Sequence, residues 1–150
     1  MQKASYFFLA LYMVKPNPRS DCPISGALDI IGDRWSLLIV RDIIMNGKNT
    51  YNEFLKSREG IATNILAARL AKLEEEEIII REEHPESKAK IFYRLTEKGI
   101  DLLPVIIEMI LWSGKYLPVS PASKVYATAL KNNKEAILQS MLKTLKKNRL

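Results

Sequence analysis

Few residues in this sequence have the types and spacing that catalysis requires. The chain has one cysteine, Cys22, and one histidine, His84, which lie far apart and make a poor nucleophile–base pair. It has no glycine-rich phosphate-binding loop. The run from Glu74 to Glu77 could suggest a cation site, but consecutive helical residues point in different directions, so we interpret it as a solvated face. The sequence therefore indicates a protein that is not an enzyme, and it predicts no metal site and no cofactor.

Contact with nucleic acid is a better-supported chemistry, and it is indicated between residues 48 and 90. Five basic residues and only two acidic ones lie within residues 48–72, and two lysines follow in a polar segment. Basic side chains neutralise phosphates, whereas small and polar side chains let a helix approach base edges. The candidate DNA-binding residues are Thr50, Arg58, Thr63, Asn64, Ala67, Arg69, Lys72, Lys88 and Lys90.

The net charge of +6 does not by itself support DNA binding by this segment. Residues 118–150 hold seven basic residues and one acidic residue, which accounts for the whole net charge. Residues 1–117 hold sixteen of each sign and are neutral. Any basicity at a DNA interface must therefore be local, as it is at Lys48, Lys56, Arg58, Arg69 and Lys72.

The candidate residues belong to a predicted helix-turn-helix. Thr50 and Glu53 form a capping box at the start of the first helix, and Gly60 permits the turn. The second helix spans about 62–76 and carries an inner apolar stripe of Ile61, Ile65, Leu66, Leu70 and Leu73. In isolation, its default interpretation is an ordinary amphipathic helix with a solvated outer face.

A β-hairpin is predicted to follow the second helix. The apolar runs 78–80 and 91–95 read as strands, and the long polar loop between them holds His84 as a solvated residue. Helix, turn, helix and hairpin in this order are the layout of the winged helix-turn-helix, whose second helix enters the DNA major groove. We therefore predict a mainly α fold with a small β-hairpin.

Helices are also predicted on both sides of this block. Pro23 begins a short apolar helix over 24–31 that ends at Gly32, and Asp33 caps a largely buried helix over 34–45. Thr96 caps a long apolar helix over 97–117 that Pro104 bends in its interior. The apolar surface of this last helix exceeds what a small core can cover, which predicts a homodimer.

The two ends of the chain are interpreted separately. Residues 1–21 form an N-terminal extension, whose apolar run SYFFLALYMV is a poor signal peptide and is either a packed segment or upstream of a true start at Met13. Residues 118–150 form a basic amphipathic helical tail with Leu138, Met141, Leu142 and Leu145 on one face. The tail could pack on the dimer helix, contact DNA phosphates or lie on a membrane surface.

From Cys22 to about Tyr116, the chain resembles the HxlR-type winged helix-turn-helix regulators, relatives of the MarR class. The pieces that carry the resemblance are Cys22-Pro23, Ile31-Gly32-Asp33-Arg34-Trp35-Ser36, Phe54-Leu55, Ile61, Leu66, Arg69-Leu70, Leu73-Glu74, Leu95-Thr96-Glu97-Lys98-Gly99 and Trp112. The resemblance implies a winged helix-turn-helix domain over 22–117 in a homodimer that binds a palindromic operator. It also implies that Thr63, Asn64 and Arg69 lie on or beside the recognition helix.

Three positions depart from the pattern of that family. Thr50 replaces the basic residue common before Tyr51, which removes a possible phosphate contact. Ala62 replaces a capping serine, so Thr63 becomes a candidate cap instead of a DNA contact. Glu77 replaces the glycine usual before the first wing strand, so that turn must be built differently.

Cys22 has two possible roles, a sensor thiol or a structural thiol. The resemblance places it at the position where some family members sense electrophiles or oxidants. A helix start at Pro23 and the nearby Arg19 favour a thiolate, whereas Asp21 opposes it. The other role is that of a buried structural thiol.

Two functions are therefore open. The first is a homodimeric transcriptional regulator that binds double-stranded DNA, with a small electrophile or oxidant as its signal. The alternative is a winged-helix protein-interaction module without sequence-specific DNA binding. A single cysteine and the lack of an apolar run long enough to cross a bilayer predict a cytoplasmic protein that does not bind membranes.

Overall fold

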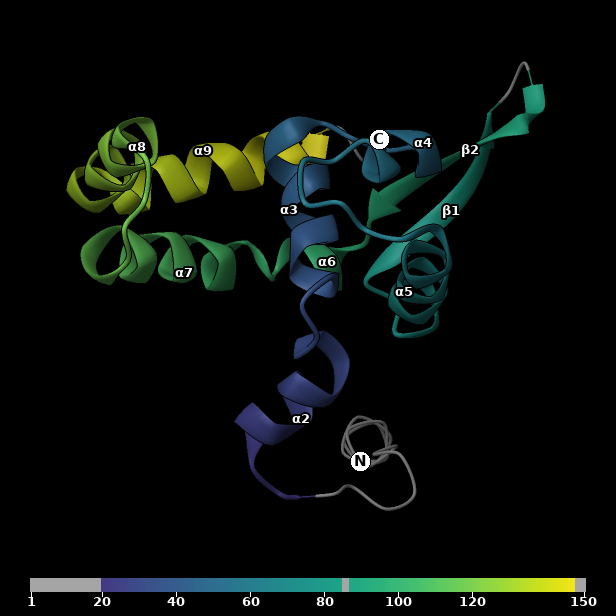
Figure 1. Ribbon diagram of the computed structural model, residues 1–150, viewed down its shortest axis with the longest axis horizontal. Helices are drawn as coiled ribbons and strands as arrows, with labels where there is room; N and C mark the ends of the chain where they lie inside the picture. Colours follow the sequence, from purple (N-terminus) through teal and green to yellow (C-terminus); the bar gives the residue numbers. More distant parts are fainter. Residues whose placement is uncertain (1–19, 85–86, 148–150) are drawn as a thin grey trace, which may run out of the picture. The chain divides into compact units, whose positions relative to one another are not determined.

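The computed structural model of the chain describes residues 20–84 and 87–147. Its contacts form two units, Met1–Asp33 and Arg34–Leu150. The described residues are mostly helical and contain one two-stranded antiparallel sheet (Figure 1). These elements confirm the predicted class, a mainly α winged helix-turn-helix with further C-terminal helices. No helix in this part of the chain is long and apolar enough to cross a membrane.

The first unit contains the helix α2, Pro23–Ile31. Its proline lies in the first turn, where the missing N–H would have no partner in any helix. The N–H of Gly32 donates to the carbonyl of Leu28 at 2.9 Å, so the predicted start and end of this helix are both confirmed. Ile24 and Leu28 are exposed. The apolar run of residues 5–14 lies outside the described residues.

The second unit begins with a turn and the helix α3, Ser36–Asn46. The predicted start at residue 34 is wrong, and so is the assignment of Asp33 as the cap. Residues 34 and 35 form a turn instead of the first residues of the helix. Trp35 is therefore the N-cap residue, and its carbonyl accepts the N–H of Ile39 at 3.0 Å. Gly47 ends the helix in the left-handed conformation, as the Asn-Gly pair predicts.

The helix-turn-helix consists of α4, Tyr51–Leu55, and α5, Thr63–Glu75. Its core is formed by apolar side chains that face α3 and the sheet, and the buried members are Phe54, Ile61, Leu66, Leu70 and Leu73. The predicted inner stripe is confirmed at four of its five positions, since Ile65 is only half-buried.

The hairpin is longer than the apolar runs suggest. Strand β1 spans Ile79–His84 and pairs with β2, Ser87–Leu95, with Ile79 opposite Leu95 and Glu83 opposite Ile91. The prediction of a long polar loop is therefore wrong, because the polar residues continue the backbone ladder as far as the pair formed by His84 and Ser87. Backbone hydrogen bonding extends the strands beyond the half-buried part that hydrophobicity detects. The side chains of His84, Lys88 and Ala89 are outside the described part.

The predicted helix over 97–117 is two helices, α6, Glu97–Ile100, and α7, Leu103–Tyr116. Thr96 caps α6 as predicted, because its hydroxyl accepts the N–H of Gly99 at 3.1 Å. Pro104 lies in the first turn of α7 and not in a helix interior. A proline inside one continuous helix would clash with the carbonyl four residues earlier and remove a hydrogen bond, so the chain restarts the helix there.

Two further helices, α8, Pro121–Asn132, and α9, Lys134–Lys147, form the tail. Ala127 and Leu130 of α8 are buried, and a Cβ atom added at Gly114 of α7 would lie 2.6 Å from the Cβ of Ala127. Helix α9 contacts α6, α7 and α8. The tail therefore packs on α7, the first of its three predicted placements.

Candidate nucleic-acid interface

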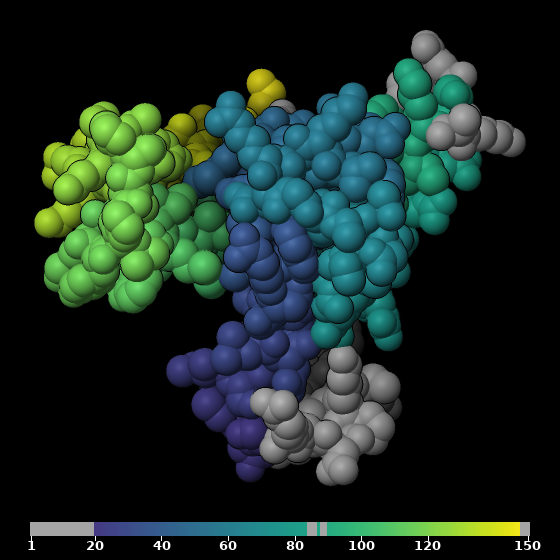
Figure 2. Space-filling model, viewed as in Figure 1, coloured from purple at the N-terminus to yellow at the C-terminus, as the bar shows by residue number. Residues whose placement is uncertain are grey.

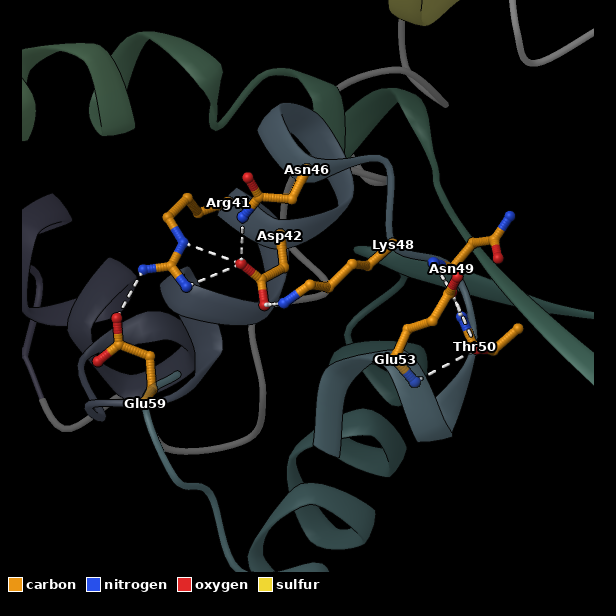
Figure 3. Close-up of polar contacts among 8 residues, drawn as sticks. All are labelled: Arg41, Asp42, Asn46, Lys48, Asn49, Thr50, Glu53 and Glu59. Carbon is orange, nitrogen blue, oxygen red and sulfur yellow. Dashed lines mark hydrogen bonds and ion pairs between the residues drawn. The ribbon is translucent and has the colours of Figure 1, made fainter. Parts of the chain in front are cut away.

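The start of α4 is held by a capping box. The Thr50 hydroxyl accepts the Glu53 N–H at 3.4 Å, and the Glu53 carboxylate accepts the backbone N–H groups of Asn49 at 2.9 Å and of Thr50 at 3.0 Å (Figure 3). These hydrogen bonds, the one from Asn49 first, lower the pKa of Glu53. The predicted box is confirmed. Because of this box, the Thr50 hydroxyl is hydrogen-bonded to Glu53.

Residues 56–62 connect α4 to α5, so the first helix ends at Leu55 and the prediction that Gly60 breaks it is wrong. Gly60 adopts φ 70°, a left-handed conformation that favours glycine. Across the turn, the Tyr51 hydroxyl donates to the Thr63 carbonyl at 2.9 Å, which joins the first residues of the two helices. Ala62 is the N-cap residue of α5 and has no side-chain capping bond. The expectation that Thr63 caps the helix is therefore wrong, and its exposed side chain lies in the first turn.

One face of α5 is exposed, small and polar. Thr63, Asn64 and Ala67 lie on it as predicted. Sequence reasoning missed Ala68 and Ala71, which are also exposed. Asn64, Ala67, Ala68 and Ala71 follow the i, i+3, i+4, i+7 spacing of one helix face, a pattern that could have identified both alanines. Such a face lets the helix backbone approach base edges closely.

The two basic residues predicted on α5 lie beside this face. Arg69 and Lys72 are half-buried, and each takes part in an interaction within the chain. Arg58 is exposed in the turn before α5. The candidate residues thus extend from Arg58 in the turn before α5 to Lys72 in its last turn.

A buried ion-pair network fixes α3 against the helix-turn-helix. The Asp42 side chain is only 3% exposed and accepts from Lys48 at 2.9 Å and from Arg41 at 2.7 Å. Arg41 also donates to Glu59 at 2.9 Å, in the turn before α5 (Figure 3). Burial raises the pKa of Asp42, but hydrogen bonds from Lys48, Arg41 and Asn46 outweigh burial and lower it.

This network changes the local charge predicted from the sequence. Lys48 was expected to add basicity to the DNA interface, yet it is half-buried and pairs with Asp42. Sequence reasoning missed Arg41 and Asp42. An Arg-Asp pair inside an otherwise apolar helix is the signal that could have indicated a buried network, because buried charges are almost always paired.

The hairpin is attached to the helix-turn-helix at its base. The Tyr93 N–H donates to the Asn49 carbonyl at 2.7 Å, and the rings of Tyr93 and Phe54 lie 6.1 Å apart between centroids. The far end of the hairpin extends beyond the surface of the helices (Figure 2). Lys90 is exposed on β2, whereas Arg94 pairs with Glu82 at 2.9 Å.

The turn between α5 and β1 is built without glycine. Glu77 adopts φ 56°, and among the described residues it is the only non-glycine residue with a positive φ. Its carbonyl accepts the Thr96 hydroxyl at 2.5 Å, and a Cβ atom added at Gly99 would lie 2.1 Å from the Ile78 carbonyl oxygen. The chain therefore places a left-handed glutamate where a glycine was expected.

Comparisons with known proteins agree on one family. The sequence model of the HxlR-like helix-turn-helix family matches residues 30–121. YdeP of Bacillus subtilis, an uncharacterized HTH-type transcriptional regulator, is 39% identical over 95 residues, which are 63% of this chain and 73% of YdeP. YodB of the same organism, an HTH-type transcriptional regulator, is 36% identical over 96 residues, which are 63% of this chain and 85% of YodB.

Solved structures similar to this chain include YodB and a second regulator, HypR. The reduced form of YodB superposes with a TM-score of 0.54 at 34% identity and covers 66% of this chain and 97% of YodB. YodB is also known in diamide-treated and quinone-bound forms. The oxidized form of the redox regulator HypR superposes with a TM-score of 0.58 at 31% identity and covers 65% of this chain and all of that one, at 100%.

Proposed function

The chain belongs to the HxlR-like helix-turn-helix family of DNA-binding transcriptional regulators, and we propose that it binds a palindromic operator as a homodimer and responds to electrophiles or oxidants through Cys22. The exposed face of α5 carries the DNA-binding part of this proposal. That face is small and polar, and the Tyr51–Thr63 hydrogen bond and the Arg41–Glu59 ion pair hold the helix in place. Asn64 and Ala67 read bases, and Arg58, Lys88 and Lys90 contact phosphates. Thr63 lies on this surface, and Thr50, Arg69 and Lys72 border it.

An apolar stripe on α7 supports the homodimer. Val105, Met109, Trp112 and Tyr116 are 41–60% exposed, and their spacing of four, three and four residues places them on one face. An exposed apolar stripe of this length is typical of a protein–protein contact, because exposure of the same side chains to water is unfavourable. A second copy covers it in this proposal.

The symmetry of the dimer determines the form of the operator. Two copies related by a two-fold axis present two recognition helices, so the preferred DNA contains two inverted half-sites. Half-sites about 10 base pairs apart, or a multiple of this, place both helices in the major groove on one side of the duplex. The proposed operator is therefore a palindrome.

Cys22 supports a thiol-based response. It is exposed and is the N-cap residue of α2, so the buried structural thiol considered from sequence is not favoured. An exposed thiol is accessible to electrophiles and oxidants. YodB, solved in diamide-treated and quinone-bound forms, and HypR, named a redox regulator, give the chemical class of the proposed signal.

A mobility shift with the DNA upstream of the protein's own gene tests the proposal. Wild-type protein is expected to shift this DNA in preference to a scrambled duplex, and Asn64→Ala is expected to lose that preference. Gln139→Ala, at an exposed position of α9, is the matched control and is expected to bind like wild type. No preference for any duplex selected from a random library would contradict sequence-specific binding and favour the interaction module.

A further inference from the structure

The C-terminal end of α9 lies beside the DNA-binding elements. Leu145 lines a recess of about 250 Å³ together with Lys48 and Asn49, which precede α4, and with Tyr93 and Arg94 of the wing. The end of the tail is therefore adjacent both to the start of the helix-turn-helix and to the base of the hairpin. In Figure 1 this yellow end of α9 runs toward α4.

The apolar face of α9 holds this end in position. Every member of the predicted stripe is half-buried, namely Leu138, Met141, Leu142 and Leu145, and the helix contacts α6, α7 and α8. At the first residue of α9, Lys134 pairs with Glu108 of α7. Because both ends of α9 are attached to the second unit, its C-terminal turn has a defined place on that unit.

The opposite face at this end is a cluster of exposed cations. Lys143, Lys146 and Lys147 are exposed, and among the described residues no ion pair involves any of the three. The one acidic residue of the tail, Glu135, lies in the first turn of α9, at the other end of the helix. The C-terminal turn therefore carries positive charge that nothing in the described part of the chain neutralises.

We propose that Lys143, Lys146 and Lys147 form a phosphate-binding patch, the tail patch, which contacts the DNA backbone next to the surface formed by α4, α5 and the wing. The inference rests on the proposed DNA-binding function and extends it to a segment outside the matched family residues 30–121. Charge complementarity selects the partner, since a duplex held by α5 presents its phosphates to the surface around α4 and the wing.

The tail patch has a specific role in this arrangement. Two cations close to this surface are paired within the chain, since Lys48 pairs with Asp42 and Arg94 of the wing pairs with Glu82. In this proposal, the tail supplies part of the positive charge that displaces counterions from the DNA when the protein binds. Phosphate contacts do not read sequence, so the tail patch raises affinity for all duplexes equally and leaves base preference to α5.

Two double variants of the full chain test this inference. Lys146→Gln with Lys147→Gln removes two charges from the tail patch. Lys124→Gln with Lys131→Gln removes two exposed charges from α8, which lies at the far end of α7 from the helix-turn-helix (Figure 1). Both double variants lower the net charge by the same amount, so a difference between them reports position and not total charge.

The measurement is DNA affinity as a function of salt. Two lost phosphate contacts reduce the slope of log K against log salt by about 1.8, so the loss of affinity between 50 and 200 mM salt becomes about twelvefold smaller. We expect this change for the tail-patch variant on both the upstream DNA and a scrambled duplex, and no change for the α8 variant.

Other results would overturn the inference. Equal slopes of log K against log salt for wild type and both double variants would show that the tail patch does not contact DNA. The proposed function would stand if Asn64→Ala still abolished the preference for the upstream DNA. Equal reductions in both double variants would indicate a general charge effect. Loss of co-sedimentation with phosphatidylserine vesicles at an unchanged DNA slope would assign the lysines to a membrane surface. Failure of wild-type protein to bind any duplex would end both proposals together.

Discussion

The Tyr51 hydroxyl donates a 2.9 Å hydrogen bond to the Thr63 carbonyl, and so joins the first residue of α4 to the first residue of the recognition helix. Both residues lie at helix N-termini, where backbone carbonyls already accept bonds within the helix and a second acceptor lone pair is available. The bond restricts the angle between the two helices. It therefore connects the capping box at Thr50 to the orientation of the exposed face of α5.

Tyr51→Phe is expected to weaken DNA binding more than folding. Loss of one hydrogen bond costs about 1 kcal/mol of unfolding free energy, and greater freedom of α5 lowers operator affinity further. Urea unfolding and a DNA titration on the same preparations measure the two effects. Tyr126→Phe on α8 is the control, and equal operator affinities for both variants would show that the Tyr51 hydroxyl does not position α5.

Glu77→Gly is expected to stabilise the protein. A left-handed conformation costs a non-glycine residue about 1 kcal/mol, and Glu77 is exposed at φ 56°. The midpoint of thermal unfolding should therefore rise. Glu75→Gly removes the same charge from the last turn of α5, where glycine lowers helix stability, and its midpoint should fall. A lower midpoint for Glu77→Gly would mean that the glutamate side chain stabilises this turn.

Asp42→Asn is expected to remove about 3 kcal/mol of stability, because the half-buried Lys48 and Arg41 lose the buried carboxylate that carries their counter-charge. The folded pKa of Asp42 is lowered, so this contribution is present above the unfolded pKa, near 3.8, and is lost as pH falls through the folded pKa. Urea unfolding from pH 7 to pH 2.5 measures it. The difference between wild type and Asp42→Asn should be constant down to about pH 4 and shrink below it. A difference that does not depend on pH would contradict the assigned role of the carboxylate.

Trp112→Glu is expected to convert the proposed dimer into a monomer. Its ring is 58% exposed in the stripe on α7 and lies 5.6 Å from the ring of Tyr116, so a carboxylate there would be buried against the second copy. Sedimentation equilibrium gives the mass, and circular dichroism checks the fold. Val125→Glu, at a position 71% exposed on α8, is the control and should remain dimeric. If Trp112→Glu remained dimeric, the stripe on α7 would not be the dimer interface.

Local signals in the sequence predicted the local parts of this fold. Pro23 and the Thr50–Glu53 box each act on neighbouring residues, so the helices that they begin start where the sequence places them. Gly60 is left-handed as a turn requires, but α4 already ends at Leu55. Non-local pairing was less visible. The polar ends of β1 and β2 are strands only because each pairs with the other, and the sequence alone gave no reason for the Lys48–Asp42 contact.

The same distinction between local signals and non-local pairing applies to the candidate site. Asn64 and Ala67 were found from helical spacing opposite buried leucines, and Ala68 and Ala71 could have been found in the same way. Which basic side chains are available for phosphates could not be deduced, because this depends on acidic partners supplied by other elements. Arg41 and Glu59 illustrate the point, since they are 18 residues apart in sequence and 2.9 Å apart in space.

Cys22→Ser is expected to abolish the response to oxidants and electrophiles. As Cys22 is the only cysteine, a disulfide can form only between two copies or with a small thiol, and a quinone adds to this one sulfur while the thiol proton ends on the hydroquinone oxygen. Intact mass should therefore show one adduct per chain after a benzoquinone, and after diamide a disulfide-linked dimer or, with an added small thiol, one mixed disulfide per chain. Operator affinity of the wild type should fall at least tenfold after modification, whereas Cys22→Ser should bind equally before and after treatment. Unchanged affinity of fully modified wild-type protein would show that the thiol is not coupled to DNA binding, while the DNA-binding surface of α5 would be unaffected.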